Sequence, residues 1–301
     1  MPTTRTVAAA NDALEAGLRA EHRDELQRAL DHYADASMAA GDDPRIVARA
    51  LTRQAGVYRR LSEWDLAADY ARRAHEIADD ADLEDLRADA LAAEGNALMC
   101  AGRFDEALAA YQRLTRAAVD DRQRGIAMQN VGSIHAQRGE HERARTAFES
   151  SRFLFHQAGY ARGEAIASNN LGRLALDCDE HSAAEALLQR ALIGARAVED
   201  AELAALALLN LAQLRVAQGA LHSAAMMAAD ASAHFVESAN RWRQVECLCV
   251  LADVAELESR FEEARDHLTR GAELARSIDA RVELRRIEAR LAAFRGATRV
   301  S

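Results

Sequence analysis

Small apolar residues recur along this chain of 301 residues at intervals of about 40. An alanine, in the motif G-x-x-x-x-A or a variant of it, returns at steps of 38, 40, 37, 40, 40 and 40 residues. A second small residue, glycine or alanine, lies twelve positions before each alanine. Two small residues that recur at a fixed period indicate pairs of helices whose axes cross at close range. Successive pairs are then expected to stack in an array. The alanines are Ala29, Ala67, Ala107, Ala144, Ala184, Ala224 and Ala264, and their partners are Gly17, Ala55, Gly95, Gly132, Gly172, Ala212 and Ala252.

Larger residues flank the recurrent alanines at two further positions. Four residues after the alanine, five repeats carry a ring or a leucine, whereas Ala71 and Ala228 depart from this pattern. Three residues before it, most repeats carry a ring or a large apolar group. We expect these larger groups to fill the space between one helix pair and the next. The preceding position holds Trp64, Phe104, His141, His181, Leu221 and Phe261, and the following one holds Tyr33, Tyr111, Phe148, Leu188 and Leu268.

Helix-breaking signals divide the pattern into short helices. The dipeptides Gly102-Arg103, Gly139-Glu140, Asp179-Glu180 and Gly219-Ala220 stand where one helix of a pair must stop. Asp43 before Pro44 predicts a helix start, and Asp200 and Asp279 suit the same capping role. The sequence therefore predicts an all-α solenoid of seven antiparallel helix pairs and a C-terminal capping helix. The expected pairs cover residues 7–39, 44–79, 82–117, 120–157, 160–197, 200–237 and 240–277, and the cap covers 280–295.

The last predicted helix has the pattern of a terminal cap. Its segment RVELRRIEARLAAF alternates apolar residues with Arg285, Arg286 and Arg290, which we expect to face water. No linker interrupts the repeats, so we expect a single solenoid domain over residues 7–295. Residues 1–6 and 296–301 are predicted to be disordered.

Segments such as SNNLGRLALDCDEHSAAEALLQRAL and AAEGNALMCAGRFDEALAAYQRL resemble the tetratricopeptide repeat (TPR) family. The resemblance covers residues 10 to 292, with a period longer than the 34 residues of the family and without its closing proline. It is closest to the long-period subclass found in bacterial maltose-activator-type regulators, peptide-sensing phosphatase regulators and kinesin light chains. The resemblance implies a right-handed superhelix in which the first helix of each pair lines a concave groove.

In that geometry, the side chains expected to line the groove change in charge and polarity along its length. Its N-terminal end is basic, its middle is a strip rich in amides, and its far end, with Glu246, Asp253 and Glu256, is acidic. The basic end carries Arg49 and Arg53, and the strip carries Asn96, Gln129, Asn130, Asn169, Asn170, Arg173, Asn210 and Gln213.

Two interpretations of these side chains remain open. Asn130, Asn170 and Asn210 lie 40 residues apart, and their amides suit either the backbone of an extended peptide or bonds between neighbouring helices. Arg49 and Arg53 belong to a stripe with Arg45 that suits bidentate contacts to carboxylates, or else solvated pairing with local acids.

The carboxylate clamp with which some TPR proteins hold chaperone C-termini is missing. The resemblance places its lysines at Ala92 and Ile166 and its arginine at Asn170. A chaperone adaptor is therefore not expected.

Charge and composition exclude several classes of function. The formal net charge is −10, which disfavours nucleic-acid binding, and all 38 basic residues are arginine. Cys100, Cys178, Cys247 and Cys249 lack the spacing of a zinc site or a disulfide scaffold. The N-terminus lacks the apolar run of a signal peptide, and no stretch is long enough to span a membrane. We expect a cytoplasmic protein.

No phosphate loop, HExxH motif or nucleophile elbow occurs, so we expect neither catalysis nor a metal or cofactor. The sequence predicts a protein-interaction scaffold that binds an extended peptide segment of a partner. The alternative is a sensor module that binds a peptide or small molecule and regulates a separate transcription factor or enzyme. Self-association through the alanine-rich segment 221–231 also stays open.

Overall fold

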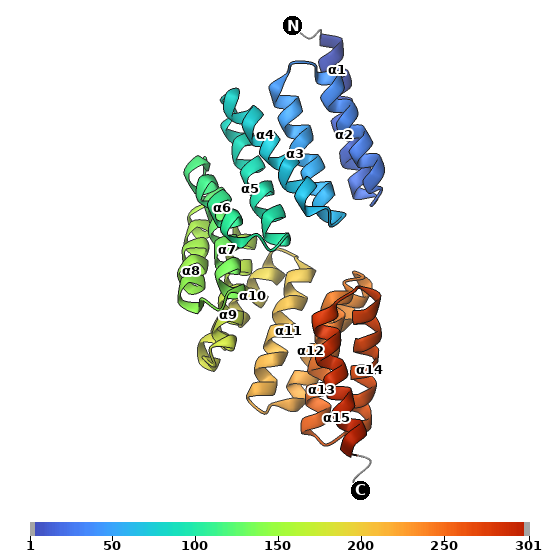
Figure 1. Ribbon diagram of the computed structural model, residues 1–301. Coiled ribbons are helices and arrows are strands. Elements are labelled where there is room, and N and C mark those ends of the chain that lie inside the picture. Colours follow the sequence, from blue (N-terminus) through green and yellow to red (C-terminus); the bar gives the residue numbers. More distant parts are fainter. Residues whose placement is uncertain (1–3, 298–301) are drawn as a thin grey trace. The chain divides into compact units, whose positions relative to one another are not determined.

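The computed structural model describes residues 4–297 and holds fifteen helices and no strand within that range (Figure 1). Within residues 4–159 and within residues 160–297, each helix packs against the next along the chain, so the prediction of an all-α solenoid of helix pairs is confirmed. The helices are α1 (Thr4–His22), α2 (Leu26–Ala40), α3 (Pro44–Arg60), α4 (Trp64–Asp80), α5 (Glu84–Cys100), α6 (Phe104–Ala117), α7 (Asp121–Gln137), α8 (His141–Gln157), α9 (Ala161–Asp177), α10 (His181–Ala197), α11 (Ala201–Ala217), α12 (Leu221–Glu237), α13 (Arg241–Leu257), α14 (Phe261–Ser277) and α15 (Arg281–Ala297).

The two ends of the helical region extend beyond the predicted limits. Helix α1 begins at Thr4 rather than residue 7, and α15 ends at Ala297 rather than residue 295. Helix therefore covers part of both segments predicted to be disordered. The remainder of those predictions, residues 1–3 and 298–301, lies outside the described residues.

The predicted turn and cap residues are mostly confirmed. Gly102, Gly139, Asp179 and Gly219 all have positive φ, between 58° and 75°. The Asp43 carboxylate accepts the Arg45 backbone N–H at 3.0 Å, with Pro44 as the first helical residue.

Asp200 caps α11 by accepting the backbone N–H of Leu203 at 3.0 Å. The prediction for Asp279 is wrong, because α15 begins two residues later and Asp279 is the positive-φ residue of the turn. Its carboxylate bonds to the Arg281 side chain instead of a helix N–H.

The chain divides into two compact units, residues 1–159 with helices α1–α8 and residues 160–301 with α9–α15. In the first unit, α3 contacts both α1 and α5, and α5 contacts α7. In the second, α11 contacts both α9 and α13. The second helices of successive pairs make no comparable contacts among the described residues, so the first helices form the more tightly curved, concave face of each unit.

The joint inside each pair is built from a small residue against a larger one. The seven recurrent alanines are fully buried. A β-carbon added to Gly132 would lie 2.6 Å from Cδ1 of Phe148, and one on Gly172 would lie 2.7 Å from Cδ2 of Leu188. These positions therefore have no room for a side chain.

The rings three residues before the alanines do not all fill the joint, contrary to expectation. Trp64 and Phe261 are the first residues of α4 and α14, and they are 40% and 55% exposed. A side chain in the first turn lies at the end of its pair, where fewer neighbours cover it.

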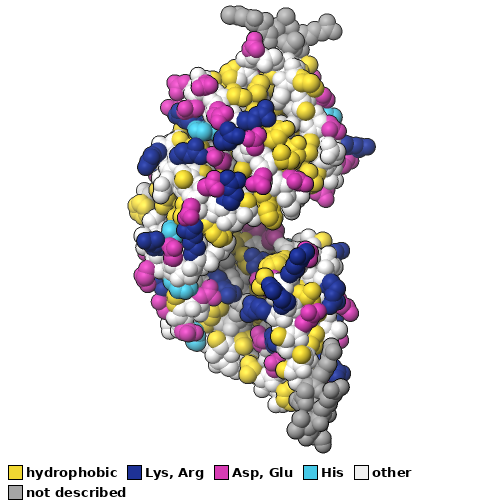
Figure 2. All heavy atoms as spheres, in the orientation of Figure 1, with side chains coloured by type: hydrophobic (Ala, Val, Ile, Leu, Met, Phe, Trp, Pro, Cys, Tyr) yellow, Lys and Arg dark blue, Asp and Glu magenta, His cyan; other side chains and the backbone are white. Residues whose placement is uncertain are grey.

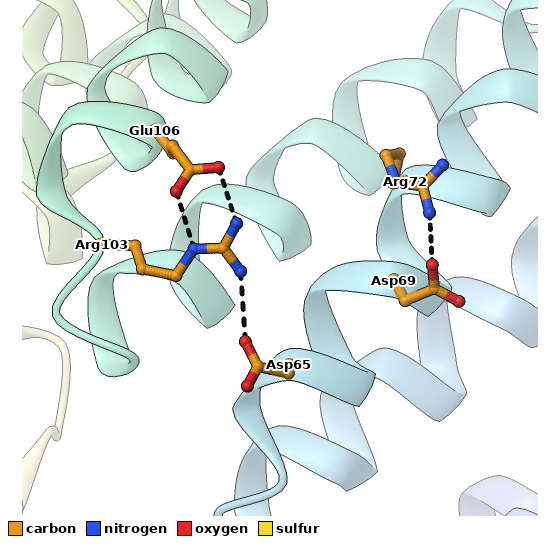
Figure 3. A network of polar contacts seen from close by, with 5 residues as sticks. All are labelled: Asp65, Asp69, Arg72, Arg103 and Glu106. Atoms are coloured by element: carbon orange, nitrogen blue, oxygen red, sulfur yellow. Dashed lines mark hydrogen bonds and ion pairs between the residues drawn. The ribbon is translucent and has the colours of Figure 1, made fainter.

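Ion pairs connect successive repeats at the surface. Arg103, just before α6, bonds to Asp65 of α4 at 3.1 Å and to Glu106 of its own helix at 2.7 Å (Figure 3). All three side chains are well exposed, so such pairs contribute little to stability.

Candidate functional site

The concave face of the first unit carries the predicted basic stripe. Arg45 forms an ion pair with Asp85 of α5 at 2.8 Å, so it adopts the local pairing considered as the alternative. Arg49 and Arg53 are exposed, and no hydrogen bond or ion pair of theirs is found among the described residues. Burial, followed by Asp85, raises the pKa of Asp89 on α5, whereas Arg53 and Arg49 oppose that rise. Both arginines therefore remain available to an anionic ligand.

The amides of this unit form a short hydrogen-bonded chain. Asn96 Oδ1 accepts the Tyr111 hydroxyl at 2.7 Å and Asn130 Nδ2 at 3.1 Å. Both lone pairs of this oxygen are then used, whereas the Asn96 amide NH₂ and the Asn130 carbonyl have no recorded bond within residues 4–297. Gln129 Oε1 is buried and has no hydrogen-bond partner among the described residues. This strip keeps unused donors and acceptors on α5 and α7.

In the second unit the structure separates the predicted amides into two roles. Asn210 Nδ2 donates to Asn169 Oδ1 at 2.9 Å, and these residues are only 5% and 3% exposed. They join α11 to α9, which favours the alternative of packing between helices over contact with a ligand. Asn170 is half-buried, and the described residues offer its side chain no recorded bond.

Arg173 and Gln213 lie together on the concave face. Arg173 donates to Gln213 of the next first helix and forms an ion pair with Asp177 at 2.9 Å. Both residues line a cavity of about 360 Å³, which also includes Glu246 and Asp253. The structure thus brings four predicted site residues around one cavity. Figure 2 shows arginines and carboxylates interspersed on the face of the protein that it draws.

The predicted acidic end of the groove, which lies in the second unit, is not the open acidic surface that we expected. Glu246 is held by Arg243 at 2.6 Å. Asp253 and Glu256 both accept bonds from Arg290 Nη2, at 2.6 and 2.7 Å. Burial raises the pKa of Asp253, and the positive charge of Arg290 opposes that rise. The acidic groups are therefore largely neutralised within the protein.

The structure adds site residues that the sequence interpretation missed. Glu283, Arg286 and Arg290 of α15 line the cavity, although the arginines were expected to face water. The sequence contained a sign of the contact between Arg290 and Asp253, because the two residues are 37 positions apart, which is the length of one repeat of this chain.

The thiols offer little chemistry. Burial raises the pKa of Cys247 to about 12 and that of Cys249 to about 11, so both remain protonated at neutral pH. Within residues 4–297, no cluster of three or more His, Cys, Asp or Glu residues is placed to hold a metal ion. Among the same residues, no helix combines the length and apolar character needed to cross a membrane.

The comparisons with known proteins concern the fold of the chain. The sequence matches no family model, and the search of curated proteins finds no relative. Solved structures with a similar fold include the following three. The quorum sensor NprR from B. thuringiensis has a TM-score of 0.70 and 18% identity, over 87% of this chain and 75% of that one.

The second is the Rap conjugation gene regulator of the plasmid pLS20 in complex with the Phr* peptide, with a TM-score of 0.65 and 17% identity over 89% and 74% of the two chains. The third is a signal transduction ATPase with a tetratricopeptide repeat sensor from Pyrococcus horikoshii, with a TM-score of 0.70 and 14% identity over 91% and 44%. At these identities the similarity concerns the fold. The chain has a helical-repeat fold of the tetratricopeptide type.

Proposed function

We propose that this chain is a non-catalytic scaffold whose concave face binds an extended peptide segment of a partner protein. The observation that carries the proposal is the half-buried Asn170 amide on a first helix, which has no recorded bond among the described residues. An amide presents both a donor and an acceptor, which matches the alternating groups of a peptide backbone. The Asn96 NH₂ and Asn130 carbonyl add the same chemistry in the first unit.

The neighbours support a peptide as the ligand class. The pLS20 regulator was solved with a peptide bound, and NprR is described as a quorum sensor. We further propose that the repeats belong to the long-period subclass, that nucleic acid is not a partner because the net charge is −10, and that the protein is cytoplasmic. Its four free cysteines support a reducing compartment.

A sensor module is a second candidate. The cavity of about 360 Å³ in the second unit supports this alternative, because its size falls in the range of small-molecule sites. A thermal-shift screen of metabolites and short peptides separates the two functions, since a ligand that binds only the folded state raises the unfolding temperature. Stabilisation by metabolites alone would favour the sensor.

Charge reversal tests the scaffold directly. The double variant Arg49→Glu/Arg53→Glu should capture less of the partner recovered by the wild-type chain, with unchanged helicity by circular dichroism. The control Arg116→Glu/Arg190→Glu makes the same charge change at exposed positions on second helices. Equal capture by both double variants would contradict the assignment of the basic stripe.

A further inference from the structure

A cavity in the second unit has the lining of a site for one small group. Its volume is about 360 Å³, and its residues come from α9, α11, α13 and α15. Val245, Val250 and Ile287 supply an aliphatic wall and are themselves buried, and the protonated Cys249 thiol lies beside them. Charged side chains surround this apolar wall. The combination suits a ligand with a small apolar body and a charged end.

Most of the charges that line the cavity already have partners in the protein. Glu246 bonds to Arg243, Asp253 bonds to Arg290, and Arg173 bonds to Asp177. Arg286 is exposed, and the described part of the chain provides it with no recorded bond or ion pair. The whole guanidinium group of Arg286 is therefore available to a ligand.

Arg290 also keeps unused donors. Its bonds to Asp253 and Glu256 both come from Nη2, which leaves Nε and Nη1 without a recorded partner inside residues 4–297. Arg286 and Arg290 are four residues apart, so they project from the same face of α15. Both arginines line the cavity together with Cys249.

We propose that this cavity anchors the C-terminal residue of the peptide ligand, with its α-carboxylate bound between Arg286 and Arg290 and its apolar side chain against Val245 and Ile287. This inference rests on the proposed peptide-binding function and adds the end of the peptide that is recognised. Guanidinium groups suit a carboxylate because they donate paired hydrogen bonds to its two oxygens.

Glu283 adds an acceptor to the site that favours a chain terminus over an inorganic anion. It lies three residues before Arg286, lines the same cavity, and has no recorded ion pair in the described range. Its carboxylate can accept the amide N–H of a terminal residue, a bond that an inorganic anion cannot form. A C-terminal residue carries that N–H and the α-carboxylate on the same α-carbon.

The test uses two probes that differ only at the end proposed to be recognised, N-acetyl-leucine and N-acetyl-leucine amide. Each is titrated into the full chain while the arginine Nε–H resonances are followed by NMR. The free acid should shift the Arg286 and Arg290 signals with a dissociation constant at least about tenfold below that of the amide, as expected for a charge-assisted contact. Arg286→Gln should remove that difference, whereas the exposed control Arg285→Gln should retain it.

Equal binding of acid and amide, or shifts confined to other arginines, would overturn the anchor whether or not the protein captures a partner. If the acid binds selectively but the concave face captures no peptide, the anchor stands and the scaffold function fails. The two failures are therefore distinguishable.

Discussion

The ring of Tyr111 occupies the space that a side chain at Gly95 would need, since a β-carbon built on Gly95 lies 2.6 Å from Cε1 of that ring. The same relation joins Gly132 to Phe148. Where the larger partner is replaced by Ala71 or Ala228, the glycine is replaced as well, by Ala55 and Ala212. In six of the seven pairs the two positions vary together, the exception being Ala252 with Leu268. The combined size of the two side chains therefore sets the distance between most paired helices.

Gly95→Ala should destabilise the protein by about 1–3 kcal/mol, because the added methyl group overpacks the joint against a buried ring. Gly56→Ala is the matched control, since Gly56 also lies inside a helix but has no atom within 4 Å of the added carbon. That variant should gain up to about 1 kcal/mol through helix propensity. Urea denaturation measures the stability of both variants. Equal effects of the two substitutions would refute the packing explanation.

The backbone angles of the turns predict opposite changes in stability for two substitutions between glycine and alanine. Ala239 has a φ of 53°, so Ala239→Gly should stabilise the protein by about 0.5–1 kcal/mol by relieving a left-handed backbone. Gly219 has a φ of 75° with open space around it, so Gly219→Ala should cost about 1 kcal/mol. The thermal unfolding temperature of each variant measures these changes. A loss of stability in Ala239→Gly would contradict the predicted relief of the left-handed backbone.

Asn169 and Asn170, neighbours on α9, should have different roles: the first supports stability through its bond to Asn210, and the second supports peptide binding. Asn210→Ala leaves the buried Asn169 oxygen without its partner and should cost about 1–3 kcal/mol of stability. Asn170→Ala should change stability by less than about 0.5 kcal/mol, as expected for a side chain without such a bond, and should weaken peptide capture. Denaturation and capture assays on both variants test this division of roles, which fails if Asn170→Ala is the more destabilising change.

Acid should weaken one contact between repeats. Arg215 of α11 donates to Glu185 of α10 at 2.7 Å, and this bond lowers the pKa of Glu185. Because the folded pKa lies below the unfolded value of about 4.3, the stabilisation is present above that value and is lost as pH falls through the folded pKa. Glu185→Gln should therefore be less stable than wild type at pH 7, with the difference shrinking between pH 5 and 3. Denaturation midpoints across this range measure it, and a pH-independent difference would contradict the ion-pair origin.

The repeated small residues allowed the fold to be predicted because they encode contacts at fixed spacing. Gly95 and Ala107, twelve residues apart, mark the crossing of two helices, so helix pairs and turns could be located from local signals. The exception at Asp279 arose because cap and turn residues have the same chemistry. Only the backbone angle, a positive φ in this case, distinguishes them.

The candidate site was less predictable because the role of a polar side chain depends on which helix faces it. Asn169 and Asn170 are adjacent in sequence, yet one is buried against Asn210 and the other has no recorded partner in the described residues. Arg290 looked like part of a solvated cap, but it bonds to Asp253 across the contact between α15 and α13. Such pairings between helices do not follow from the composition of either helix alone.

Site-specific photo-cross-linking tests the central claim that the first helices carry the binding face. A benzoylphenylalanine residue is introduced at Asn170 on α9 or, in a separate variant, at Ile193 on α10, which is 70% exposed. Each variant is then irradiated with the partner captured by the wild-type chain. Adducts from position 170 and few or none from position 193 are predicted, whereas adducts mainly from position 193 would contradict binding on the concave face.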